Sequence, residues 1–93
     1  MIKSFADKRA EQFAHNGKYQ SIPSQLNKRA MMRLVQLDNA TCPNDLKVPP
    51  SNHLEKLSGN RKNQHSIRIN QQYRLCFAFD NGNAYNVEII DYH

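Results

Sequence analysis

The feature that most constrains the fold is a change in the spacing of apolar residues midway along the chain. In segment 25–37, four apolar residues recur at steps of four, four and three, which is one face of an α-helix: Leu26, Ala30, Leu34 and Leu37. Segment 40–52 contains three prolines and no period, so it is expected to be a loop. Beyond it, apolar residues alternate with polar ones, as in β-strands. The chain is therefore predicted to form helices first and strands afterwards.

A second, shorter helix is predicted near the N-terminus, after a short strand at 1–5. Ser4 is expected to cap this helix, which ends near Gly17. Alternation predicts strands at 65–69, 73–79 and 85–89, and a short extended piece that ends at Gly59. The Asn-Gly pair within 80–83 favours a tight hairpin turn because both residues tolerate positive φ. The prediction is one α+β domain, residues 1–93, with two helices on one face of three or four antiparallel strands.

The chain is basic, with 13 lysines and arginines against 8 aspartates and glutamates and a formal net charge of +5. This excess favours a polyanionic partner such as nucleic acid or an acidic protein, although an ordinary basic surface explains it equally well. The N-terminus is charged within its first nine residues, and no apolar stretch approaches the roughly 20 residues that span a bilayer. We expect a soluble, cytoplasmic protein with no membrane segment.

The two cysteines, Cys42 and Cys76, are far apart and lack metal-binding spacing. Cys76 lies in an apolar strand, where a buried reduced thiol is favoured over a disulfide. The chain also has no glycine-rich phosphate loop, nucleophile elbow or zinc signature. No metal ion and no cofactor is predicted.

Basic residues are concentrated in segment 56–79, which contains no acidic residue. They are Lys56, Arg61, Lys62, Arg68 and Arg74. Alternation places Arg68 and Arg74 on the strand face opposite the apolar residues, and Arg61 precedes these strands. Guanidinium groups that converge on one surface would bind a phosphate and neutralise charge in a transition state. The alternative is that they are solvated and pair with Glu88 or Asp80.

Three proton-transfer groups, Asp91, Tyr92 and His93, follow the last predicted strand directly. The strand would anchor Asp91, although chain ends often fray. The α-carboxylate of His93 is expected to favour a protonated imidazole, which could donate a proton to a leaving 5′-oxygen. Asp91 would orient that imidazole or take the proton of a 2′-hydroxyl. Tyr92 or Tyr73 would stack on a base.

Other polar residues are less suited to catalysis. His65 shares its face with Ile67 and Ile69, so a satisfied core histidine is favoured there. His53 is expected to be exposed. Three basic residues fall off the apolar stripe of the second helix and are expected on its solvated outer side, with contact to an acidic partner left open: Lys28, Arg29 and Arg33.

On these residues the chain resembles the HigB-type toxins of the RelE/ParE superfamily, which belong to bacterial toxin–antitoxin pairs. The resemblance covers segments 1–5, 54–61, 64–70, 73–77 and 87–93, and is most specific in the last of these and in the central HSIRIN stretch. It implies a RelE-like fold, with two N-terminal helices packed on a curved antiparallel sheet of three to five strands. It also implies a ribosome-dependent mRNA endonuclease that uses the RNA 2′-hydroxyl as nucleophile and needs no metal.

The resemblance assigns roles by position. Catalytic roles fall to His93, Asp91, Tyr92, Arg68 and Arg74, and RNA-binding roles to Arg61, Lys56, Lys62 and Tyr73. It implies a HigA-like helix-turn-helix antitoxin as partner, with operator DNA bound only through the toxin–antitoxin complex. Better-known HigB toxins carry a histidine and a lysine where this chain has Glu55 and Ser58, which predicts milder toxicity.

Two alternatives remain open from the sequence. A ParE-like toxin shares the fold but inhibits DNA gyrase through protein contacts and needs no catalytic residues. A non-catalytic binding module would act only as a corepressor with its antitoxin. The first predicts toxicity without His93, and the second predicts no growth arrest.

Overall fold

The chain forms a mixed structure of helices and one four-stranded antiparallel sheet. The computed structural model describes residues 1–61 and 63–91. Two helices, α1 (Lys8–Asn16) and α2 (Asn27–Asn39), precede the strands β1 (Glu55–Lys56), β2 (Gln64–Arg68), β3 (Tyr73–Asp80) and β4 (Asn83–Asp91). The strands lie in the order β1-β2-β3-β4, so each pairs with its neighbour in sequence. The predicted α+β class and antiparallel sheet are confirmed.

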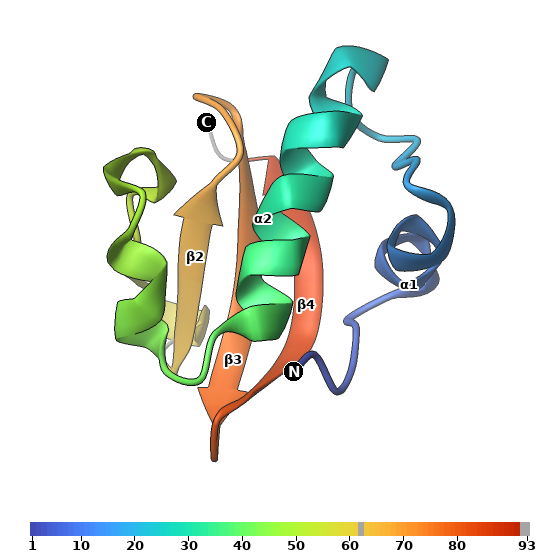
Figure 1. Ribbon diagram of the computed structural model, residues 1–93. Helices are drawn as coiled ribbons and strands as arrows, with labels where there is room; N and C mark the ends of the chain where they lie inside the picture. Colours follow the sequence, from blue (N-terminus) through green and yellow to red (C-terminus); the bar gives the residue numbers. More distant parts are fainter. Residues whose placement is uncertain (62, 92–93) are drawn as a thin grey trace.

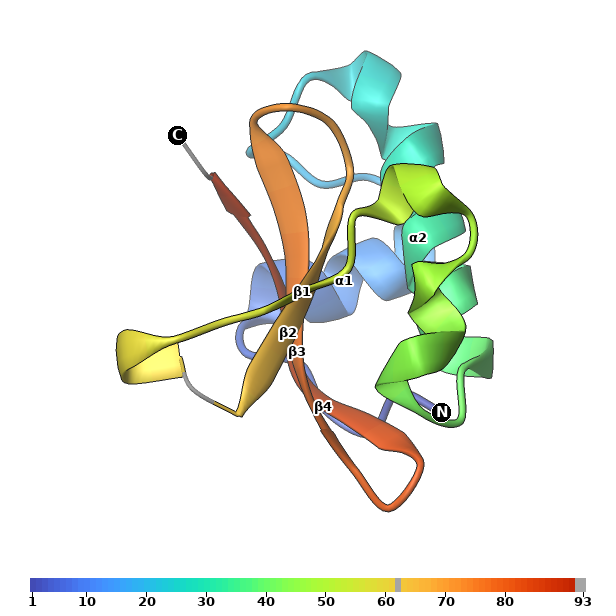
Figure 2. The same ribbon diagram turned by 90° about the vertical axis from the view of Figure 1, so that its left-hand side faces the viewer.

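The helical half differs from the prediction of two helices packed together on the sheet. α2 lies against the sheet, whereas α1 lies beside β4 (Figures 1 and 2). The N-cap of α1 is Asp7, whose carboxylate accepts a hydrogen bond from the amide of Ala10, and not Ser4. The reason is that the chain before Asp7 runs parallel to β4, with bridges from Ile2 to Ala84 and from Phe5 to Val87. The predicted N-terminal extended piece therefore exists, and it delays the helix.

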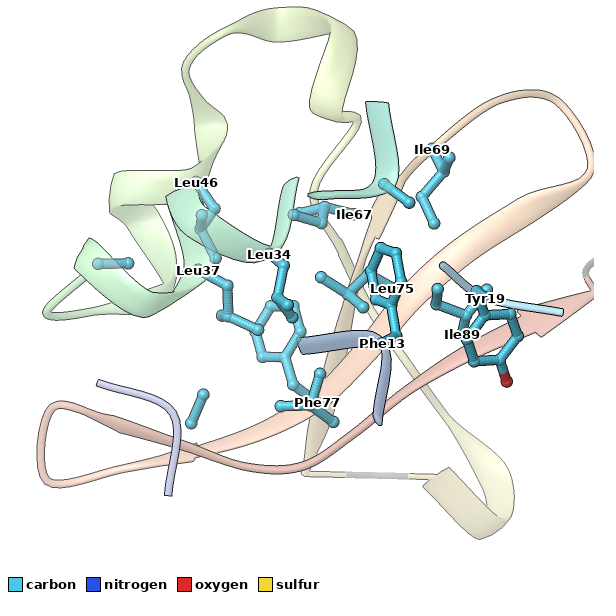
Figure 3. Packing of buried hydrophobic residues seen from close by; sticks show 14 of the residues in the cluster. Phe13, Tyr19, Leu34, Leu37, Leu46, Ile67, Ile69, Leu75, Phe77 and Ile89 are labelled. Carbon is cyan, nitrogen blue, oxygen red and sulfur yellow. The ribbon is translucent and has the colours of Figure 1, made fainter. Parts of the chain in front are cut away.

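The core lies between α2 and the sheet and continues to α1 (Figure 3). α1 contributes Phe13, which packs edge-on against Tyr19 with the ring centroids 5.9 Å apart. The predicted stripe of α2 contributes buried Ala30, Leu34 and Leu37, and the sheet contributes alternating residues: Ile67, Ile69, Leu75, Phe77, Val87 and Ile89. Burial of this apolar surface supplies the main drive for folding.

The proline-containing connection carries two short 3-10 turns, Pro43–Lys47 and Pro50–Asn52. Buried Leu46 and fully buried Asn52 attach this segment to the core, and the Asn52 amide donates to the Leu46 carbonyl. Hydrogen bonds from Thr41 and Cys42 lower the pKa of Asp45. The connection is therefore an ordered segment whose second 3-10 turn contacts β2, an order that the absence of a period did not predict.

Two residues on the β4 side adopt left-handed conformations that shape the last hairpin. Asn81 and Gly82 have φ of 50° and 80°, as predicted for the turn. Asn86 has φ of 56° at a bulge where the β3–β4 register shifts between Cys76 and Ala78. The bulge lets the Asn86 amide donate to the hydroxyl of Ser4 at 2.9 Å. No helix within residues 1–61 and 63–91 is long and apolar enough to cross a membrane.

Asn86→Val should destabilise the protein by about 1–3 kcal/mol, because a β-branched residue is strained at positive φ. Asn86→Gly is the matched control and should change the free energy of unfolding by less than about 0.5 kcal/mol, since the side chain is exposed and glycine adopts this φ freely. Urea denaturation measures both. Equal free energies of unfolding for the two variants would contradict a positive φ at residue 86.

Candidate active site

The pairing of β2 with β3 sets two arginines side by side. Arg68 and Arg74 are direct cross-strand partners, and the preceding pair, Ile67 with Leu75, is buried in the core. Because side chains alternate along a strand, both arginines lie on the sheet face that points away from this core. This is the placement predicted from the sequence. We call this side the arginine face.

Arg74 is held in place by neutral groups and is only 5% exposed. Its Nε donates to the hydroxyl of Ser66 at 2.7 Å, and its Nη2 donates to the carbonyls of Ser66 and His53. Its Nη1 lies 3.9 Å from Oε2 of Glu55, a carboxylate that is half exposed. Arg74 is therefore preorganised, with one side of its guanidinium directed at an acidic and accessible neighbour.

Arg61 reaches the same face from the 3-10 turn Gly59–Arg61. Its Nη1 donates to Gln64 at 3.1 Å, and its Nη2 lies 3.5 Å from Oε1 of Glu88. Glu88 pairs with Cys76 across β3 and β4, opposite the core side. The pairing with Glu88 that the sequence left open is therefore present. Because the pair is partly exposed, it adds only about 0–1 kcal/mol to stability.

Asp91 lies on the other side of the sheet. It is the cross-strand partner of Tyr73, whereas Arg74 is the partner of Ile90. Asp91 and Tyr73 line a small cavity of about 230 Å³ beside Arg9, and Gln72 donates to the Asp91 carboxylate at 3.1 Å. The structure therefore does not bring Asp91 and the arginine face together. Asp91 lies at an odd-numbered position, as do the buried Val87 and Ile89. Side-chain alternation along the strand therefore already placed Asp91 on the core side in the sequence.

The remaining predicted residues divide into those outside and those inside the described part of the chain. Lys62, Tyr92 and His93 lie outside the described residues, so their predicted roles stay predictions. Lys56 is exposed and pairs with His65, so it projects from the sheet face opposite Glu55. Ser58 is exposed, and its carbonyl accepts the amide of Arg61.

Sequence reasoning missed the position of Glu55 and the burial of Arg33. Glu55 is brought to Arg74 by its pairing with Ser66, a register that a two-residue strand does not reveal in advance. Arg33, expected on the solvated side of α2, is only 7% exposed, and its Nε donates to the carbonyl of Arg68 at 2.9 Å. Burial lowers the pKa of Arg33, and the charge of Arg29 lowers it further.

The thiols and possible metal ligands add no chemistry to this face. Cys42 is exposed and Cys76 is buried, and both are free, as expected. Burial raises the pKa of the Cys76 thiol to about 11, so it is not a nucleophile near neutral pH. Within residues 1–61 and 63–91, no group of three or more His, Cys, Asp or Glu side chains is arranged to hold a metal ion. The polar groups that the described part of this face offers include the guanidinium of Arg74, the hydroxyl of Ser66 and the carboxylates of Glu55 and Glu88.

Comparison with known proteins identifies the family. A family model described as the RelE-like toxin of the type II toxin–antitoxin system HigB matches residues 3–93. The chain belongs to this family. The toxin is 42% identical over 87 residues to Toxin HigB-1 of Vibrio cholerae, covering 92% of each chain. It is 34% identical over 93 residues to Endoribonuclease HigB of Proteus vulgaris, covering all of both chains. The resemblance noted from the sequence is confirmed.

Solved structures agree on the fold. The toxin superimposes on a chain of the heterotetrameric YoeB–YefM toxin–antitoxin complex from Staphylococcus aureus with a TM-score of 0.63. The match covers 100% of this chain and 98% of that one at 20% identity. At this identity the likeness concerns the architecture of helices and sheet only.

His65 supplies a pH-dependent test of this architecture. Its ring stacks on Phe77 at 6.2 Å, but the expectation of a satisfied core histidine is not met, because the residue is half-buried and its Nδ1 has no hydrogen-bond partner among the described residues. Burial, and then the charge of Lys56, lower its pKa below 6.5. A depressed pKa means that the unfolded state binds the proton more readily, so this contribution to stability is present above pH 6.5 and is lost as the pH falls.

Wild-type protein should therefore lose more stability than His65→Phe between pH 7.5 and 5.5, as measured by urea denaturation. His15→Gln changes an exposed histidine and should follow the wild type. An unchanged pH dependence in His65→Phe would show that the folded state accommodates the charged imidazole.

Proposed function

We propose that this toxin is a ribosome-dependent endoribonuclease that cuts mRNA at its arginine face, with the RNA 2′-hydroxyl as nucleophile. The observation that carries the proposal is the cross-strand pair Arg68 and Arg74, with Arg74 fixed by Ser66 and the His53 carbonyl. The family is one of toxins, and a relative that matches over its whole length is named an endoribonuclease. We infer that translated message is cut in the decoding site.

The arginines would act on the phosphate. As the 2′-oxygen attacks phosphorus, negative charge increases on the non-bridging oxygens. Arg68 and Arg74 would stabilise this charge with Arg61 at the side, and fixed donors are effective because they need little reorganisation during the reaction. Arg74 is the best preorganised of the three, since its Nε is already bound to Ser66.

We infer that Glu55 takes the proton of the 2′-hydroxyl. Its carboxylate is half exposed and lies 3.9 Å from Arg74, on the face where the phosphate would bind. Asp91, which the sequence suggested as base or orienting group, lies on the opposite face. The second of those roles, orienting His93, is the one we assign to Asp91.

His93 would act as general acid. As the bond from phosphorus to the 5′-oxygen breaks, its imidazolium donates a proton to that oxygen, while Glu55 holds the proton of the nucleophile. The products are a 2′,3′-cyclic phosphate and a 5′-hydroxyl, and with Glu55 as base and His93 as acid this route needs no metal or cofactor. Tyr92 would stack on a base, and Lys62 would bind an RNA phosphate. Tyr73 and Lys56 lie on the opposite sheet face from Arg68 and Arg74, so their predicted stacking and phosphate contacts would involve RNA away from the cleaved phosphate.

We propose a HigA-like helix-turn-helix antitoxin as the partner, with operator DNA bound through the complex. The family is defined by a toxin–antitoxin system, and a structurally similar chain is part of a toxin–antitoxin heterotetramer. The net charge of +5 would support docking to ribosomal RNA in the cytoplasm, with an affinity that falls as salt increases.

His93→Ala should abolish growth arrest when expressed without antitoxin, because loss of a general acid lowers cleavage by roughly 10²–10⁴-fold. Primer extension on translated messages measures the cut sites, and His15→Ala serves as a control at an exposed histidine. Growth arrest by the wild type without new message ends would refute cleavage. Arrest that survives His93→Ala would favour a gyrase-directed, ParE-like toxin.

Glu55→Gln and Asp91→Asn separate the two carboxylates. Glu55→Gln should lower the rate of ribosome-bound mRNA cleavage by about 10²-fold or more. Asp91→Asn should lower it less, because it leaves the base intact. Faster cleavage by Glu55→Gln would show that Glu55 only competes with the phosphate for Arg74.

A further inference from the structure

A second basic site lies at the exposed edge of β2, next to the arginine face. It is a cavity of about 390 Å³, which we call the edge cavity. It is lined by Arg29 and Arg33 of α2 and by Arg68 of β2, together with Ser51, His53 and Asn70. Among these residues, only Arg68 has a side chain with a role in the proposed cleavage.

The edge cavity follows from incomplete strand pairing. β1 pairs with β2 only at Ser66 and His65, so the outer carbonyls of the following residues have no strand partner. α2 supplies donors in its place: Arg33 Nε binds the carbonyl of Arg68 at 2.9 Å, and Arg29 Nη1 approaches the carbonyl of Ile69 at 3.4 Å. Burying a backbone carbonyl without a donor is costly, so these arginines have a structural reason to be there.

The contacts with backbone carbonyls do not explain why the donors at the edge cavity are positively charged. No carboxylate lines the edge cavity, and no ion pair joins its three arginines to any acidic residue in the described part of the chain. Arg61 and Arg74, by contrast, have Glu88 and Glu55 beside them. Like charges gathered at one partly buried place repel each other, and an anion would relieve that repulsion.

We propose that the edge cavity binds a backbone phosphate of the same RNA strand whose neighbouring phosphate is held by Arg68 and Arg74. The inference rests on the proposed function and extends it to a second phosphate subsite. His53 links the two places, because it lines the edge cavity while its carbonyl accepts a hydrogen bond from Arg74. Arg68 lies between them, because Arg33 binds its carbonyl beside the edge cavity while its side chain lies on the arginine face.

Continuity with the arginine face favours RNA over an acidic protein segment. A strand bound across Arg68 and Arg74 would pass the edge cavity, because Arg68 and His53 belong to both places, and Arg29 in its lining is exposed. Guanidinium groups bind phosphate oxygens bidentately, and the remaining Arg33 donors and the Ser51 and Asn70 side chains add polar contacts. An acidic antitoxin segment is the competing occupant, and the experiment below separates it from RNA.

The test compares Arg29→Gln with Lys28→Gln. Both residues are exposed on α2 and lose one positive charge, but Lys28 lies at an apolar groove beside Met32 and not at the edge cavity. The probe is a fluorescent single-stranded RNA with 2′-O-methyl groups throughout, which cannot be cut because it lacks the nucleophile. Binding is measured by anisotropy over a range of salt concentrations, and urea denaturation checks that both variants are folded.

Arg29→Gln should weaken binding several-fold and lower the slope of log affinity against log salt by about 0.7, the value for one lost phosphate contact on a single strand. Lys28→Gln should leave the slope unchanged, and Arg29→Lys should retain it. Equal effects of the two glutamine variants would overturn the proposal, as would a lack of measurable binding by wild-type protein at low salt. Loss of antitoxin affinity with unchanged RNA binding would assign the edge cavity to protein and also overturn it.

This readout is independent of cleavage. Failure of the proposed function would appear as uncut message on ribosomes with wild-type toxin, whereas failure of the second subsite would appear as unaltered binding of the methylated strand by Arg29→Gln.

Discussion

The register of β2 against β3 determines both the core and the arginine face. It pairs Ile67 with Leu75 on one side of the sheet and Arg68 with Arg74 on the other. A slip of one residue would turn each set to the opposite face, placing two guanidinium groups in the apolar core and two branched side chains in the polar layer. Desolvation of the charges alone makes that alternative unfavourable. The side-by-side placement of Arg68 and Arg74 is therefore selected by the same free energy that forms the core.

The edge of the sheet imposes the second constraint. A two-residue β1 leaves most of the β2 edge without a strand partner, and an unprotected edge invites pairing with other chains. Arg33 and Arg29 satisfy the exposed carbonyls from α2. A neutral donor would perform the same structural task. Arginines add positive charge that the fold does not need. The cost is visible at Arg33, whose pKa is lowered by burial and by repulsion from Arg29. This surplus is the physical basis for a phosphate subsite.

Much of this arrangement could be predicted from the sequence, for reasons that differ between residues. The alternation of β2 and β3 has a period of two, so it located Arg68 and Arg74 without knowledge of tertiary structure. The same rule, applied to Val87 and Ile89, assigns Asp91 to the core side of β4. The position of Glu55 depends on a pairing of two residues, and the burial of Arg33 depends on where α2 meets a strand edge. Neither follows from periodicity, because both are set by long-range packing. Likewise, the parallel bridges of 2–5 to β4 overrode the capping preference of Ser4.

The distribution of counter-charges suggests an order of events for the proposed reaction. In the free protein Glu55 and Glu88 lie beside Arg74 and Arg61, which weakens the attraction of these arginines for a distant polyanion. The edge cavity has no such carboxylate, so it attracts the strand first. Once one phosphate is held there, its neighbour reaches Arg68 and Arg74 at high effective concentration. In the proposed reaction it would then replace Glu55 beside Nη1 of Arg74, and the released carboxylate would be left beside the 2′-hydroxyl. We infer that a face whose arginines are partly neutralised by neighbouring carboxylates binds a nucleotide strand more tightly once a second contact has aligned it.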